Sequence, residues 1–161
     1  MITALLSVLL VLTPIQSTGQ ISDVQKKDFL KLLNTLPHEG DFYTDTAIEK
    51  AGPYLPILFS LTEKDLANYD IYPFGALSRG LCDRKKHRDY AVNHFNDIQH
   101  PVLKLAWGSM LFDADVASSE IVQFLRNALR SPEQSKLLSE IIGPKFADFK
   151  RRVMSYSDRK P

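Results

Sequence analysis

The chain has a single cysteine and no acceptor site for N-glycosylation. Cys82 is the only cysteine among 161 residues, so no disulfide can form within the chain and burial of apolar side chains must hold the fold. No Asn-x-Ser/Thr glycosylation acceptor occurs either, because Asn34 is followed by Thr35 and Leu36. Both absences fit a bacterial envelope better than a eukaryotic secretory route.

Sequence motifs of common enzymes are also missing. The chain has no HExxH or CxxC metal motif, no Gly-x-Ser-x-Gly elbow and no glycine-rich phosphate loop. We therefore expect no cofactor and favour a non-enzymatic role.

A large charge of either sign is absent. The formal net charge is +1, which argues against a nucleic-acid partner. The charge is nevertheless unevenly distributed, with −4 over residues 21–70, +3 over 71–112, −2 over 113–144 and +4 over 145–161. Such a distribution can orient a protein toward a charged partner, and it also arises from solvated helix faces.

Basic residues are absent before Lys26, yet the first residues otherwise have the pattern of a secretory signal peptide. Ala4 to Leu12 is apolar apart from Ser7, and Pro14 ends the run. The stretch is shorter than the roughly 20 residues of a membrane span, although an uncleaved anchor remains an alternative. A helix packed in the core is a second alternative, but the run is apolar on every face.

Small residues after the apolar run indicate a cleavage site. Ser17 and Gly19 occupy the −3 and −1 positions for cleavage before Gln20. We therefore predict a signal peptide over 1–19 and a periplasmic or secreted protein.

Signals for helices recur along the remaining chain, while signals for strands do not. Ser22 with Gln25, and Thr46 with Glu49, form capping-box patterns at the start of two helices. His38 to Phe42 is predicted to be a loop. The pattern predicts an all-α fold, a compact stack of about eight short antiparallel helices, as one domain over 20–156 with a flexible tail at 157–161.

One predicted helix is apolar around its whole axis. Val102 to Phe112 has no polar stripe, so we expect it to be the central buried helix. In an earlier predicted helix, which Pro73 opens, Gly75 and Gly80 are small residues that would let a neighbouring helix approach closely.

The start of this helix resembles a known repeat family. The segment His100-Pro101-Val102-Leu103-Lys104-Leu105-Ala106 is similar to the start of a HEAT-like repeat helix, with His100 where that family commonly has Asp. A gap-free overlay of residues 70–83 on 100–113 also pairs three identical residues. The resemblance implies an α-solenoid of stacked helix pairs that acts as a protein–protein scaffold.

Three residues form the best candidate for a metal site. His94 and Asp97 are three positions apart on one predicted helix, and a turn could bring His100 back toward them. A small exported metal-binding protein or metal-dependent enzyme centred on these residues is the alternative function. A boundary histidine held by a hydrogen bond is the competing interpretation of His94.

Two further groups have a catalytic and a structural interpretation. Cys82 could be a nucleophile paired with His87, but its place in an apolar stripe favours a small buried hydrophobe. Asp113 and Asp115 could share acid–base work, but Asp115 is better explained as the cap of the next helix.

Two basic features are candidates for binding a partner. Arg84, Lys85, Lys86 and Arg88 are the predicted partner-binding residues, and the partner we expect is another protein. The last helix is amphipathic and basic, so peripheral membrane contact through residues 144–156 is a further hypothesis. Docking of that helix on the core with its charges in water is the simpler interpretation.

Overall fold

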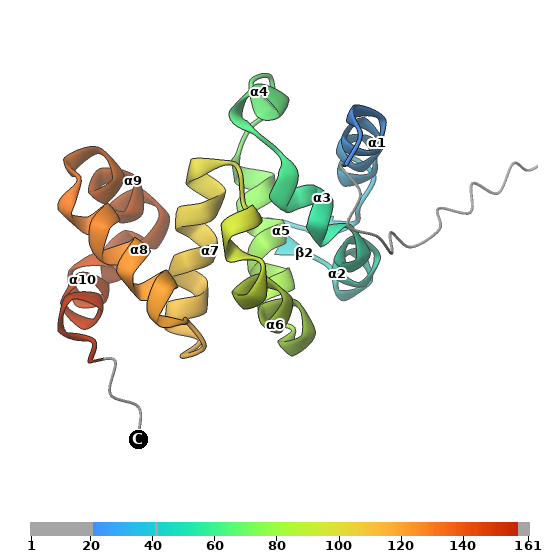
Figure 1. Ribbon diagram of the computed structural model, residues 1–161. Helices are drawn as coiled ribbons and strands as arrows, with labels where there is room; N and C mark the ends of the chain where they lie inside the picture. The colour runs from blue at the N-terminus through green and yellow to red at the C-terminus, as the bar shows by residue number, and fades with distance from the viewer. Residues whose placement is uncertain (1–20, 41, 158–161) are drawn as a thin grey trace, which may run out of the picture.

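The computed structural model describes residues 21–40 and 42–157, within which the chain is almost entirely helical (Figure 1). The α-helices are α1 (Asp23–Leu33), α2 (Asp45–Ala51), α3 (Leu55–Ser60), α4 (Glu63–Leu66), α5 (Tyr72–Cys82), α6 (Lys85–Asn93), α7 (Pro101–Asp113), α8 (Ser119–Arg130), α9 (Pro132–Ile142) and α10 (Phe146–Ser155). Single 3-10 turns occupy Gly52–Tyr54, Phe95–Asp97 and Gly143–Lys145. The all-α prediction is confirmed. The signal peptide predicted at 1–19 and the tail beyond residue 157 lie outside the described residues.

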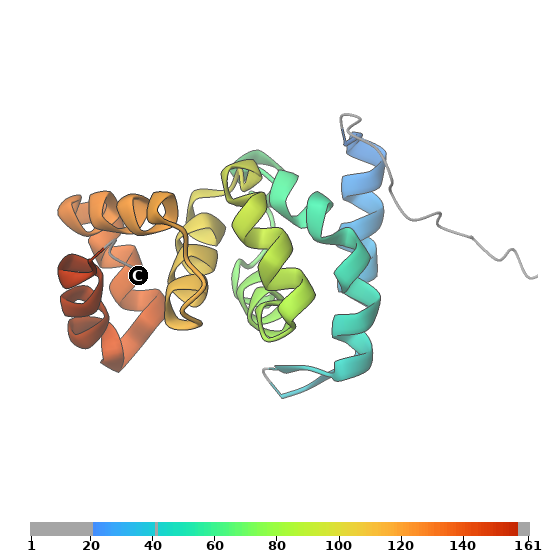
Figure 2. The ribbon, with the colours of Figure 1, turned by 60° about the horizontal axis from the view of Figure 1, so that its bottom comes forward.

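Helix α7 lies at the centre of the molecule. Figures 1 and 2 show it between the helices α1–α6 on one side and α8–α10 on the other. It packs against α5, α8 and α9, and eight of its thirteen residues are buried. The prediction of a central buried helix is confirmed, because a helix that is apolar all round must be covered on all sides.

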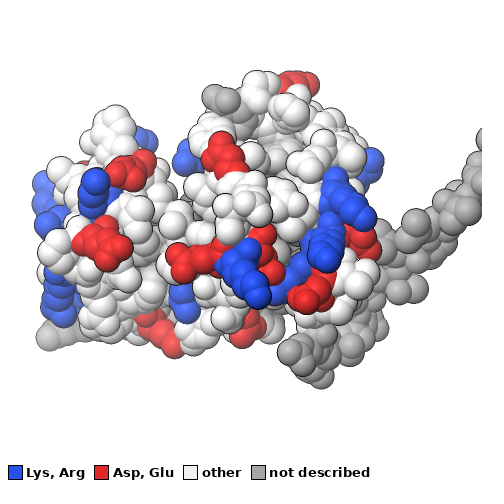
Figure 3. All heavy atoms as spheres, turned by 90° about the horizontal axis from the view of Figure 1, so that it is seen from above, with Lys and Arg blue, Asp and Glu red and all other residues white. Residues whose placement is uncertain are grey.

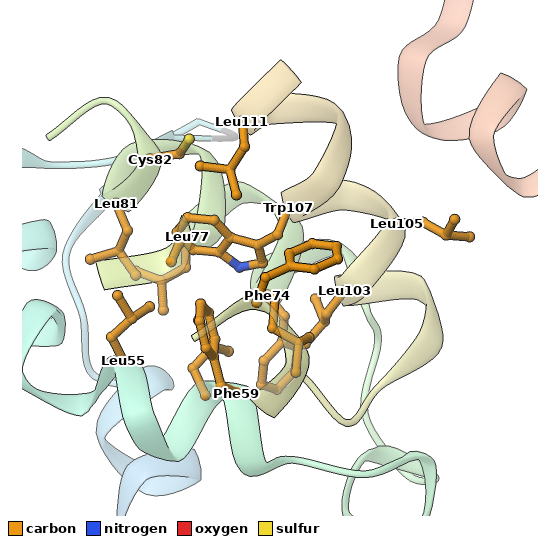
Figure 4. Packing of buried hydrophobic residues seen from close by; sticks show 14 of the residues in the cluster. Leu55, Phe59, Phe74, Leu77, Leu81, Cys82, Leu103, Leu105, Trp107 and Leu111 are labelled. Atoms are coloured by element: carbon orange, nitrogen blue, oxygen red, sulfur yellow. The ribbon is translucent and has the colours of Figure 1, made fainter. Parts of the chain in front are cut away.

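The core between α5 and α7 is built around Trp107. Its side chain is fully buried, and its ring lies edge-on to Phe59 with 5.3 Å between ring centroids. Figure 4 shows Trp107 among side chains from α3 and α5, with Phe74 and Leu77 beside it. Burial of so large an aromatic side chain makes this contact a main source of stability.

The start of α1 follows its predicted capping box, whereas the start of α2 does not. The backbone N–H of Gln25 donates to Ser22 Oγ at 3.3 Å, and the Ser22 N–H donates to Gln25 Oε1 at 2.8 Å. For α2 the predicted cap, Thr46, is wrong: Thr44 Oγ1 accepts from the Ala47 N–H at 3.3 Å. The Thr44 N–H also donates to the Pro37 carbonyl, which fixes the extended backbone from which the helix starts.

The segment predicted as a loop forms an antiparallel hairpin instead. Its strands are β1 (His38–Glu39) and β2 (Phe42–Tyr43), with His38 opposite Tyr43 and Glu39 opposite Phe42. Strand β2 packs on α5, and Gly40 at the turn has a φ of +58°, which suits glycine. Strands of two residues are too short to give an alternating pattern, so the sequence carries no strand signal here.

Only one of the two glycines predicted to admit a neighbour does so. A Cβ on Gly80 would lie 2.3 Å from Ile48 Cδ1, so α2 approaches α5 closely at this point. A Cβ on Gly75 would have no atom within 4 Å, and the prediction for Gly75 is wrong. Gly75 lies one helical turn and a half from Gly80, on another face of α5.

Candidate functional site

Three of the four predicted partner-binding residues make ion pairs or hydrogen bonds within the protein. Arg84 pairs with Asp45, and Lys85 pairs with Asp89 at 2.7 Å. Arg88 donates to the backbone carbonyls of Cys82 and Asp83 at the end of α5, at 3.1 and 3.3 Å. Lys86 is the member of the run without an ion pair or hydrogen bond to another described residue.

The uneven charge along the sequence is mixed in space. On the face seen in Figure 3, basic and acidic side chains lie next to each other over the part of the molecule that contains α1–α6. No broad surface of one sign covers that face, so a partner is not selected there by long-range charge alone.

The predicted metal ligands are only partly brought together. His94 Nδ1 lies 2.8 Å from Asp97 Oδ2, and the His94 ring stacks on Tyr90 with 4.2 Å between centroids. His100 is buried at the start of α7. Across residues 21–40 and 42–157, no group of three or more His, Cys, Asp or Glu side chains is placed to hold a metal ion.

Cys82 has the environment of a small core residue. It is 5% exposed, and burial raises the pKa of its thiol to about 11. The thiol is therefore protonated at neutral pH, which is the opposite of what a nucleophile needs. His87 is also buried, and its ring packs against Gly52 at the end of α2.

The two aspartates at the end of α7 have structural surroundings. Asp113 pairs with Arg152 at 2.5 Å and so joins α7 to α10. Asp115 was expected to cap the next helix, and this is wrong: Ser118 Oγ accepts from the Ile121 N–H at 3.3 Å. Asp115 instead takes a left-handed backbone with a φ of 56° in the turn three residues earlier.

The apolar face of α10 is covered by the protein. Phe149 and Val153 are fully buried, and Phe112 of α7 lies edge-on to Phe149 with 5.5 Å between centroids. Arg126 of α8 donates to the Val153 carbonyl at 3.2 Å and to the Tyr156 carbonyl. Phe149 and Val153 are therefore not available to a membrane surface, and Met154 is the large apolar side chain that this segment exposes. Within the described part of the chain, none of the helices has the length and hydrophobicity needed to span a bilayer.

A surface groove that sequence reasoning did not identify is the best candidate site. Its volume is 490 Å³, within the range of about 300–1,000 Å³ typical of ligand pockets. Its walls are the C-terminal end of α1, the β1–β2 hairpin, the turn after α4 and the first residues of α5. We call it the tyrosine groove, because Tyr43, Tyr69 and Tyr72 all line it.

The rings of the tyrosine groove differ in exposure. Tyr69 is 43% exposed and Tyr72 57% exposed, while Tyr43 is half-buried and burial raises its pKa. Phe74 forms the buried floor and lies edge-on to Tyr69 with 6.3 Å between centroids. The groove therefore offers flat aromatic surface at its rim above an apolar base.

Polar groups in the tyrosine groove are available to a ligand. Among the described residues, the side-chain amides of Asn34 and Asn68 and the three tyrosine hydroxyls have no hydrogen-bond partner. His38 also lines the groove, and its Nδ1 lies 3.4 Å from the Leu36 carbonyl oxygen.

An ion pair joins α1 and α4, the helices that precede two of the walling segments of the tyrosine groove. Lys26 of α1 pairs with Asp65 of α4 at 2.8 Å, with both side chains largely shielded from solvent. Asp65 also accepts from the Thr62 backbone N–H at 2.8 Å, and these contacts lower its pKa although burial opposes them. The turn after α4 is thereby held in position beside α1.

The signal for the tyrosine groove in the sequence is a dense aromatic stretch. Tyr69, Tyr72 and Phe74 fall within six residues. In the sequence, Phe74 fits the apolar stripe of a helix and Tyr69 fits a helix end, and nothing in the stretch shows that the hairpin packs beside it.

Acidification is expected to destabilise the protein through His87 and His100. Burial lowers the pKa of both rings; Lys86 and Arg84 lower the pKa of His87 further, and Glu63 partly opposes the effect at His100. The unfolded chain binds protons near the ordinary pKa of 6.5, so stability is complete above that pH and falls as the pH drops below it.

Urea unfolding at pH 7.5 and pH 5.5 measures this effect above the range in which carboxylates titrate. We expect a lower midpoint at pH 5.5, and a smaller difference in the His87→Gln/His100→Gln variant than in the His38→Gln control, whose ring is exposed. Equal wild-type midpoints at both pH values would contradict the prediction.

Comparison of the chain with protein-family models, with curated proteins and with solved structures gave no match.

Proposed function

We propose that this chain is an exported, non-enzymatic helical module that binds another protein, and that the tyrosine groove is its binding surface. One observation carries the proposal: exposed aromatic side chains gather at this groove. Tyr69 and Tyr72 line it and are 43% and 57% exposed. Aromatic side chains are enriched at protein interfaces because they bury much area at little cost in conformational entropy.

The lining of the groove supports a peptide segment as the bound element. A rim of exposed rings with free amide and hydroxyl groups offers both apolar contact and hydrogen bonds to a peptide backbone. An extended peptide can make both kinds of contact at once, because its side chains can pack on the rings while its backbone N–H and C=O groups form the hydrogen bonds. The resemblance of α7 to a HEAT-like helix, which implies a scaffold role, points in the same direction and stays a prediction.

Export is the part of the proposal that rests mainly on the sequence. The signal peptide predicted at 1–19 supports it, and so does the single cysteine, whose thiol is buried in the structure. A buried thiol is protected from oxidation outside the cytoplasm.

Selection from a displayed library of random peptides tests the binding function. We expect the wild-type protein to enrich a set of peptides. These peptides should bind the Tyr69→Ala/Tyr72→Ala variant at least about tenfold more weakly than they bind wild type, because aromatic side chains often act as binding hot spots. Neither side chain belongs to the buried core, since Tyr69 is 43% and Tyr72 57% exposed, so the variant should keep its fold, which circular dichroism checks.

The matched control removes exposed apolar side chains elsewhere. Val24 and Met154 are 67% and 43% exposed and do not line the groove, so the Val24→Ala/Met154→Ala variant should bind the selected peptides like wild type. Enrichment of no peptide, or equal binding by the groove variant, would overturn the proposal.

A further inference from the structure

The lining of the tyrosine groove is charged with one sign only. Among the described residues that line it, Asp70 is the carboxylate, and none of them is a lysine or an arginine. An anionic ligand would meet Asp70 without a cation to balance it, so the groove favours a cation or a neutral group.

The carboxylate of Asp70 is held in a defined orientation. Its Oδ1 accepts from the Tyr72 backbone N–H at 3.0 Å, a local turn at the start of α5. No other described residue binds the carboxylate, and Asp70 is exposed. One oxygen therefore positions the group while the other is available to a ligand.

Aromatic rings flank this carboxylate in the chain. Tyr69 and Tyr72 lie within two residues of Asp70, in the turn between α4 and α5, and both rings are exposed. Tyr69, Asp70 and Tyr72 line the same groove, so attraction between a cation and an aromatic face can add to an ion pair with Asp70 there.

We infer that the bound segment carries an arginine whose guanidinium pairs with Asp70 and stacks on the tyrosine rings of the groove. This inference rests on the proposed function and names the chemistry of the partner. Arginine fits better than lysine because its planar group pairs with a carboxylate and stacks on an aromatic ring at the same time. The free amides of Asn34 and Asn68 then serve the backbone of the extended segment.

The test uses the tightest arginine-containing peptide from the selection and a twin with citrulline, a neutral isostere, in place of arginine. Fluorescence polarisation measures both on wild type and on Asp70→Asn, which keeps an oxygen to accept from Tyr72. We expect about a tenfold loss for either change alone and little further loss for the two together, because both remove one charge-assisted contact.

The matched control is Glu133→Gln, an exposed carboxylate on α9 with no ion pair to a described residue. It should bind the peptide like wild type. Raising NaCl from 50 to 500 mM shortens the Debye length from about 14 Å to about 4 Å and so screens the ion pair. This increase in salt should weaken peptide binding to wild type more than peptide binding to Asp70→Asn.

Two results would overturn the inference, and they can be told apart. The arginine contact would be wrong if the selected peptides lacked arginine, or if they bound Asp70→Asn as well as wild type. If those peptides still required Tyr69 and Tyr72, the proposed function would be unaffected. Binding of neutral oligosaccharides through the same tyrosines, with no peptide selected, would overturn the inference and the proposed function together.

Discussion

Replacing Trp107 with alanine is expected to lower the free energy of unfolding by about 3–5 kcal/mol, the usual cost of deleting a buried tryptophan side chain. The ring is fully buried between α5 and α7 and contacts Phe59, so its removal leaves a cavity at the centre of the core. A domain of this size has a total stability of about 5–15 kcal/mol, so the variant should be marginally folded.

Circular dichroism in urea is the appropriate measurement, because Trp107 is the only tryptophan and its fluorescence is lost with it. Trp107→Phe keeps an aromatic ring and should lose less. Met154→Ala is the matched control: its side chain is 43% exposed, so the midpoint should move little. A Trp107→Ala midpoint equal to that of wild type would show that α7 is not the centre of the core.

Two glycine substitutions are expected to change stability in opposite directions. A Cβ on Gly52 would lie 2.6 Å from Cε1 and Nε2 of His87, whose ring is buried and has little room to move. Gly52→Ala should therefore cost about 1–3 kcal/mol, as overpacking of a core does. Gly75→Ala places its methyl in open space within α5 and should stabilise by up to about 1 kcal/mol through helix propensity.

A double-mutant cycle identifies the cause of the Gly52 effect. In a His87→Ala background the ring that clashes is gone, so Gly52→Ala should cost much less than it does in wild type. Equal costs in the two backgrounds would mean that the backbone at Gly52, rather than the contact with His87, is responsible.

Much of the helical framework could be predicted because its signals are local. Ser22 and Gln25 form their capping box through contacts within one turn, and Ser131 with Pro132 starts α9 as its sequence indicates. Likewise, the apolar residues around the whole axis of α7 require that it be covered on all sides. Such features depend on residues a few positions apart, and neighbouring elements change them little.

Features that depend on residues distant in the sequence could not be predicted. Gly75 and Gly80 look alike in the sequence, and only the approach of Ile48 from α2 distinguishes them. Thr44 and Thr46 are both good caps, and the contact of Thr44 with Pro37 decides between them. Arg84 appears free in a basic run, but Asp45 lies beside it in the fold.

The candidate site shows the same division. The sequence by itself determined an all-α chain with one central apolar helix and an aromatic stretch at Tyr69–Phe74, because composition and helical periodicity are properties of neighbouring residues. Only the tertiary structure decided that the stretch lines a groove. That groove exists because the hairpin packs on α5 and the ion pair between Lys26 and Asp65 holds α4 beside α1, both contacts between residues far apart in the chain.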